Sequence, residues 1–108
     1  MTVPYILNPL TYASNIGDGT KTVTTAGTAV PLSSTSVPCK VVYITARSTN
    51  TGRIMVGGST VVAAISTSSR GLPLSANDTT PPIIVDDLNK VYIDSTVSGE
   101  GVMFMYLS

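Results

Sequence analysis

The chain has 108 residues, lacks histidine and tryptophan, and has a single cysteine, Cys39. Without histidine, neither a Ser–His nor a Cys–His pair can form, which excludes the commonest arrangements for nucleophilic catalysis. A lone cysteine cannot form an intrachain disulfide. We therefore expect Cys39 to be a reduced, buried residue that behaves as a small hydrophobic side chain.

Charge is also scarce, because six basic and six acidic residues give a formal net charge of zero. A nucleic-acid partner is not expected, since phosphate binding normally needs a basic stripe or a positive domain. A membrane is not expected either, because the longest apolar runs are about five to seven residues, against roughly twenty for a spanning helix. The amino terminus has no basic region typical of a signal peptide. We expect a protein made and used inside a cell, or assembled there into something that later leaves.

No group of residues has the spacing of a reactive site. Asp86, Asp87 and Asp94 do not follow the pattern of a calcium-binding loop, and the Asp86–Asp87 pair is typical of a turn. Gly57 and Gly58 are followed by neither a lysine nor an expected helix, so they predict a tight turn rather than a phosphate-binding loop. The sequence thus predicts no enzyme, no catalytic residue, no metal, no cofactor and no small-molecule substrate.

Hydroxyl residues and short β-type runs dominate what is present. Thr and Ser together supply 29 of the 108 residues, and Val, Ile, Thr and Tyr recur in short runs between turn residues. Turns about eight to twelve residues apart predict an all-β fold, an antiparallel β-sandwich that is jelly-roll-like, with very little helix. The candidate strands are residues 21–25, 28–32, 40–47, 53–56, 60–65, 71–74, 82–86, 90–95 and 101–107.

The first nineteen residues differ from the rest and are interpreted as an extended N-terminal arm, with residues 20–108 as the β-sandwich domain. Pro4 and Pro9 oppose helix and central-strand pairing, and the arm ends in the turn signal Gly17-Asp18-Gly19. The arm either folds back over its own core or lies on a neighbouring subunit or partner. Its apolar side chains gain about 1.5–3 kcal/mol each when buried.

Two candidate strands are apolar on both faces. In residues 102–107, Val102, Phe104 and Tyr106 alternate with Met103, Met105 and Leu107, and residues 40–47 have a similar pattern. By contrast, the alternation in residues 90–94 predicts a strand with one solvent-exposed face, which includes Asp94. A two-layer sandwich covers one face of each sheet, so a second apolar face needs cover from loops, from the arm or from another chain. We therefore expect a dimer or trimer, or binding to a partner lattice, and the candidate partner-binding residues are Tyr5, Ile6, Leu7, Leu10, Tyr12, Met103, Met105 and Leu107.

The order of several short segments resembles small β-rich virion proteins of tailed bacteriophages, including head decoration or cement proteins with jelly-roll-like sandwiches. The likeness covers roughly residues 21–107. It lies in the order of these segments and in the types of residue they contain, and it includes no catalytic motif. The segments are residues 21–24 (KTVT), 38–46 (PCKVVYITA), 50–58 (NTGRIMVGG), 71–75 (GLPLS), 86–94 (DDLNKVYID) and 99–102 (GEGV).

This resemblance implies a non-enzymatic structural protein that binds the major capsid protein across capsid seams and stabilises the capsid. It implies location at the capsid surface of the virion, after assembly in the host cytoplasm. One alternative is a tail, baseplate or head-fibre β-sandwich module that binds a host glycan or protein, for which scattered tyrosines could stack on sugar rings. A further alternative is an unrelated β-sandwich binding module or enzyme.

Overall fold

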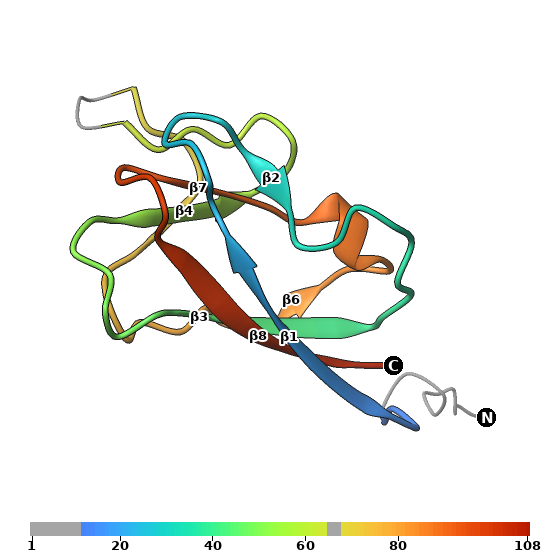
Figure 1. Ribbon diagram of the computed structural model, residues 1–108. Coiled ribbons are helices and arrows are strands. Elements are labelled where there is room, and N and C mark those ends of the chain that lie inside the picture. Colours follow the sequence, from blue (N-terminus) through green and yellow to red (C-terminus); the bar gives the residue numbers. More distant parts are fainter. Residues whose placement is uncertain (1–11, 65–67) are drawn as a thin grey trace.

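The computed structural model describes residues 12–64 and 68–108, and it is an all-β structure of two antiparallel four-stranded sheets. Figure 1 shows the two sheets as two layers. One sheet has the order β1-β8-β3-β6 and the other β2-β7-β4-β5. The strands are β1 (Ile16–Thr22), β2 (Val30–Pro31), β3 (Val41–Ala46), β4 (Ile54–Gly57), β5 (Leu72–Leu74), β6 (Ile83–Ile84), β7 (Tyr92–Ser95) and β8 (Gly101–Leu107).

One hydrophobic core lies between the two sheets. In the β1-β8-β3-β6 sheet, Val42, Ile44 and Ala46 of β3 and Val102 of β8 are fully buried. The other sheet contributes Ile54, Val56, Leu74 and Ile93 to the same cluster. Both sheets thus bury one face against the other, as the alternation of side chains along each strand requires.

The predicted alternation in the two doubly apolar strands is confirmed. In β8, Val102 is buried and Phe104 and Tyr106 pack on the core, while Met103 and Met105 are exposed on the opposite face. In β3, buried and half-buried residues alternate without interruption. Cys39 is buried as expected, and its Sγ donates to the carbonyl oxygen of Val85 at 3.2 Å. Burial, aided by the negative charges of Asp87 and Asp86, raises the pKa of the Cys39 thiol.

Several predicted boundaries are wrong. Residues 16–19, assigned to the arm and its closing turn, belong to β1, which begins at Ile16 and pairs along its whole length with β8. Residues 60–64 form one isolated bridge between Val62 and Arg70 rather than a strand. Proline explains the shortness of β6, because Pro81 and Pro82 precede Ile83 and cannot donate to a ladder.

The predicted turn around Asp86 and Asp87 is confirmed, and it continues into the 3-10 helix η1 (Leu88–Lys90). The Asp87 carboxylate caps this turn by accepting from the backbone N–H of Asn89, and it also accepts from Ser36 and Val37. The Ser36 hydroxyl, followed by the Asn89 and Val37 amides, holds the pKa of Asp87 below its ordinary value.

The prediction that Asp94 lies on a solvent-exposed face of β7 is also wrong, because Asp94 is completely buried. Its carboxylate accepts hydrogen bonds from the backbone N–H groups of Gly27 at 3.0 Å, Ala63 at 2.9 Å and Ser95 at 2.8 Å. Asp94 therefore ties two loops, one before β2 and one after β4, onto its own strand. The loops in turn cover the outer side of the β2-β7-β4-β5 sheet.

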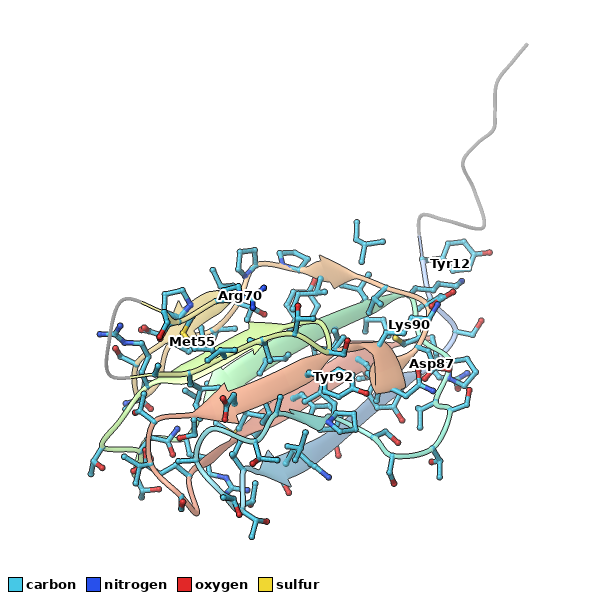
Figure 2. The ribbon with its side chains drawn as sticks, turned by 90° about the horizontal axis from the view of Figure 1, so that it is seen from above. Tyr12, Met55, Arg70, Asp87, Lys90 and Tyr92 are labelled. Carbon is cyan, nitrogen blue, oxygen red and sulfur yellow. The ribbon has the colours of Figure 1, made fainter. Side chains whose placement is uncertain are left out.

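A second, smaller apolar cluster lies under those loops. Met55 of β4 packs there with Val61 and Ala63, and Ala29 and Tyr92 close its edge. Figure 2 shows Met55 and Tyr92 on this side of the molecule. The outer side of the β2-β7-β4-β5 sheet is thus covered by its own chain.

Candidate functional site

The other sheet presents a mostly apolar outer face that none of the described loops covers in the same way. We call this surface the outer face, and define it by three residues from each of the strands β1, β8 and β3. Met103 is 47% exposed, Met105 41% and Ile16 72%. The nine residues are Ile16, Asp18, Thr20, Met103, Met105, Leu107, Val41, Tyr43 and Thr45.

The register of the strands brings these side chains into rows. Met105 lies opposite Asp18 on one side and opposite Tyr43 on the other, while Met103 lies between Thr20 and Thr45. A depression of about 600 Å³ opens over this part of the sheet, lined by residues of β1, β3 and β8 and by Thr79. Methionine side chains adapt their shape readily, so they suit contact with the surface of another protein.

Two glycines of β1 leave room for aromatic rings of β8. Gly17 and Gly19 pair with Tyr106 and Phe104, and the aromatic rings occupy the space that side chains on β1 would fill. A Cβ on Gly19 would lie 2.7 Å from Cζ of Phe104. The rings of Phe104 and Tyr106 are themselves 6.2 Å apart between centroids. The Gly-Asp-Gly sequence is therefore strand covered by aromatic rings, and the two aromatics at matching spacing in β8 were the signal for it.

The structure brings together three of the predicted partner-binding residues. Met103 and Met105 line the depression, and half-buried Leu107 continues the row toward Ile16 and Val41 at the end of the sheet. Ile16 and Tyr43 belong to the same surface and were missed. Four further predictions, Tyr5, Ile6, Leu7 and Leu10, lie outside the described residues.

Tyr12, the remaining predicted partner-binding residue, is the first residue that the structure describes. Its side chain is 73% exposed and projects away from the sheets (Figure 2), while its carbonyl oxygen accepts from Lys40 Nζ at 3.2 Å. Just after it, the backbone N–H groups of Ser14 and Asn15 donate to the carbonyl oxygen of Ser108. Tyr12, Ser14 and Asn15 therefore lie at the Leu107 end of the outer face.

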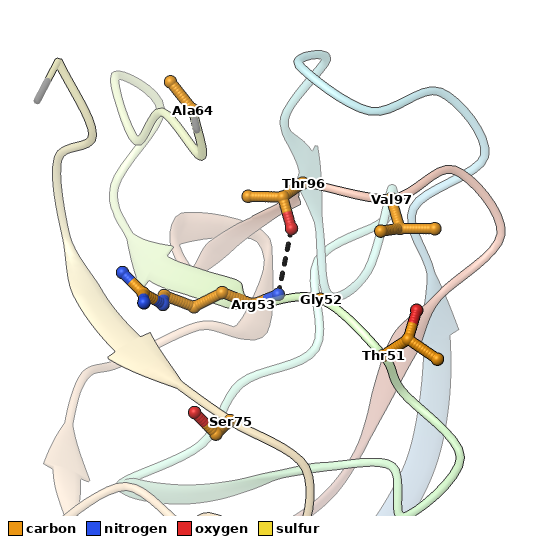
Figure 3. A pocket seen from close by; sticks show the side chains of 7 residues that line it. All are labelled: Thr51, Gly52, Arg53, Ala64, Ser75, Thr96 and Val97. Carbon is orange, nitrogen blue, oxygen red and sulfur yellow. Dashed lines mark hydrogen bonds between the residues drawn. The ribbon is translucent and has the colours of Figure 1, made fainter. Parts of the chain in front are cut away.

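Two further hollows lie elsewhere on the surface. One, of about 370 Å³, is formed by loop residues around Arg53, Ser75 and Thr96 (Figure 3), where the backbone N–H of Arg53 donates to Thr96 Oγ1 at 2.9 Å. The described residues that line it include no aromatic side chain. The other, of about 350 Å³, lies between β5 and β6 at one open side of the two sheets.

Charged groups of the described residues act mainly within loops rather than on the outer face. The Glu100 carboxylate accepts from the backbone N–H groups of Thr51 and Gly52 and from the Thr51 hydroxyl. These bonds, led by the Thr51 amide, hold the pKa of Glu100 below its ordinary value. In an exposed ion pair, Lys90 Nζ lies 2.7 Å from Asp86 Oδ1, and this contact raises the pKa of Lys90.

Within residues 12–64 and 68–108, no group of three or more Cys, Asp and Glu side chains could hold a metal ion. None of the helical structure in those ranges is long and apolar enough to cross a membrane. Comparison of the chain with protein-family models, with curated proteins and with solved structures found no match.

Proposed function

We propose that this protein is a non-enzymatic structural protein of a bacteriophage virion, which decorates the capsid and stabilises it by binding the major capsid protein. The observation that carries the proposal is the difference between the two sheets. Loops held by Asp94 cover the outer side of one sheet, whereas the other sheet presents exposed Met103, Met105 and Ile16. An apolar face of this kind is typical of a protein-binding surface.

We also propose the finer fold, a β-sandwich of the jelly-roll type with an extended arm before β1. The strand order supports it, because β1 neighbours β8, β2 neighbours β7, β3 neighbours β6 and β4 neighbours β5. Such nested pairs arise when one long antiparallel hairpin folds over into two sheets. Jelly rolls are a common architecture of viral capsid domains.

The composition suits repeated attachment to a closed shell. The chain has no net charge, and 29 of its 108 residues are Thr or Ser, so many copies can lie side by side without strong repulsion. A specific interface buries roughly 800 Å² on each partner. Self-association as a dimer or trimer would add avidity, because each further contact to the lattice becomes effectively intramolecular. The N-terminal residues Tyr5, Ile6, Leu7 and Leu10 would extend the contact.

The proposal is tested by binding purified protein to expanded, empty capsids of the phage that encodes it, followed by co-sedimentation. We expect saturable binding by the intact chain and strongly reduced binding by the double variant Met103→Ser, Met105→Ser. The matched control is Leu72→Ser, because Leu72 is 40% exposed but lies on β5 of the other sheet. The control should bind as the intact chain does.

A second variant, lacking residues 1–11, tests the arm while leaving β1 complete. We expect it to keep its unfolding midpoint and to lose affinity for capsids, because the core cluster of the described residues runs from Val23 to Tyr106. Intact protein that ignores capsids but binds a host glycan on an array would favour the tail, baseplate or head-fibre alternative instead.

A further inference from the structure

The four edge strands of the two sheets are not protected equally. Three are short and carry or follow proline: β2 has two residues and contains Pro31, β5 has three and contains Pro73, and β6 has two and follows Pro82. Short length and proline both prevent an edge from pairing with another strand. By contrast, the edge strand β1 has seven residues and no proline.

The hydrogen bonds at the two ends of β1 show which backbone groups point outward. Asn15 and Ser108 exchange two hydrogen bonds, and the Val23 N–H donates to the carbonyl oxygen of Glu100 at 2.9 Å. In an antiparallel ladder, pairs of residues that exchange backbone hydrogen bonds alternate with pairs that do not. The backbone N–H and C=O groups of the odd-numbered residues of β1 therefore point toward β8. The N–H and C=O groups of the even-numbered residues therefore point to the free edge, where no strand of the described chain pairs with them: Ile16, Asp18, Thr20 and Thr22.

We propose that this edge pairs with the β1 edge of a second copy of the chain, antiparallel and around a two-fold axis. The two four-stranded sheets then form one continuous sheet, and the two outer faces lie side by side. This inference does not rest on the proposed function, because the edges can pair whatever the outer face binds.

The side chains select one register. With Gly19 opposite Gly19 of the partner subunit, Ile16 lies opposite Thr22 of the partner subunit and Asp18 opposite Thr20 of the partner subunit. All four outward-facing residues then lie in pairs that exchange hydrogen bonds, and side chains of opposed residues share a face. A shift that placed Asp18 opposite Asp18 of the partner subunit would set like charges against each other.

The same pattern favours a second copy over an unrelated strand. The edge is self-complementary, since each Asp18 carboxylate meets a threonine hydroxyl that can donate to it. The chain has no net charge, so two copies approach without long-range repulsion. Glycine at the axis removes any side-chain clash there.

The test is the oligomeric state of the full chain, measured by sedimentation velocity over a range of micromolar concentrations. We expect a dimer for the intact protein. Thr20→Asp should weaken it by about tenfold or more, because it opposes two carboxylates at both symmetric positions. Thr20→Lys at the same exposed site should preserve or tighten the dimer, because lysine then faces Asp18 of the partner subunit.

Thr45→Asp is the control, since Thr45 lies on the outer face but on the internal strand β3. It should leave the dimer intact, and equal dissociation by Thr45→Asp and Thr20→Asp would overturn edge pairing in favour of stacked faces. Hydrogen exchange gives an independent readout, because the amides of Asp18 and Thr20 should be protected only in the dimer. A monomeric intact protein overturns the proposal, whether those amides exchange rapidly or are protected by its own N-terminal segment.

Discussion

At the residue scale, Asp94 is the side chain whose role differs most from its sequence setting. It lies on β7 in a Lys-Val-Tyr-Ile-Asp pattern that predicts an exposed face, yet it is fully buried. A buried carboxylate is tolerated when hydrogen bonds satisfy it, and here three backbone N–H groups do so. Asp94 therefore acts as the anchor for the two loops over its sheet.

We predict that Asp94→Ala lowers the free energy of unfolding by about 3–5 kcal/mol, because it leaves the N–H groups of Gly27, Ala63 and Ser95 without their acceptor. Asp94→Asn keeps one acceptor oxygen and should lose less. Urea unfolding monitored by circular dichroism measures both. Equal stability of Asp94→Ala and the intact chain would show that the loops do not depend on this carboxylate.

At the element scale, β1 depends on the fit between its glycines and the rings on β8. The strand contributes no side chain at positions 17 and 19, and Tyr106 and Phe104 fill that space. Aromatic cover of strand glycines stabilises a position that would otherwise be weak. The pairing of β1 with β8 is thus specified by four residues on two strands.

We predict that Gly19→Ala destabilises the protein by about 1–3 kcal/mol, because its methyl group would lie within 3 Å of the Phe104 ring. Combining Gly19→Ala with Phe104→Leu should cost less than the sum of the two single changes, since the smaller side chain makes room. Thermal unfolding of the four proteins in this cycle gives the coupling energy. Strict additivity would mean that ring and glycine do not interact.

At the scale of the whole molecule, the titrating groups predict a plateau of stability around neutral pH. The chain has no histidine, and the described carboxylates with shifted pKa values, Asp87 and Glu100, are shifted downward. A lowered pKa contributes stability above the ordinary pKa of the group, and that contribution is lost as the pH falls through the lowered value. The raised pKa of Cys39 acts oppositely, because its thiol ionises more readily in the unfolded chain once the pH exceeds about 8.5.

We therefore predict unfolding midpoints that are nearly constant between about pH 6 and pH 8 and decline in acid below about pH 4.5. Glu100→Gln should reduce the acid decline, because the amide does not titrate. Differential scanning calorimetry across this range measures both effects. A steep change in the midpoint between pH 6 and pH 8 would contradict the prediction.

Several features follow from the sequence because they depend on neighbouring residues alone. The all-β character and the alternating faces of β3 and β8 follow from β-branched residues at a spacing of two. The burial of Cys39 and the turn at Asp87 were predicted by the residues around them. The strand boundaries near Gly17 and Val62 were not, because pairing with distant segments decided them.

Only the tertiary structure decided which apolar face the chain covers for itself. The sequence shows that strands are apolar on both sides, but not that loops 67 and 31 residues away would bond to Asp94 and cover one sheet. Nor does it show that β1 would lie at an edge where no described strand pairs with it, while the other three edges are short and carry or follow proline. These features depend on contacts between segments far apart in the chain, and neither composition nor local periodicity carries information about such contacts.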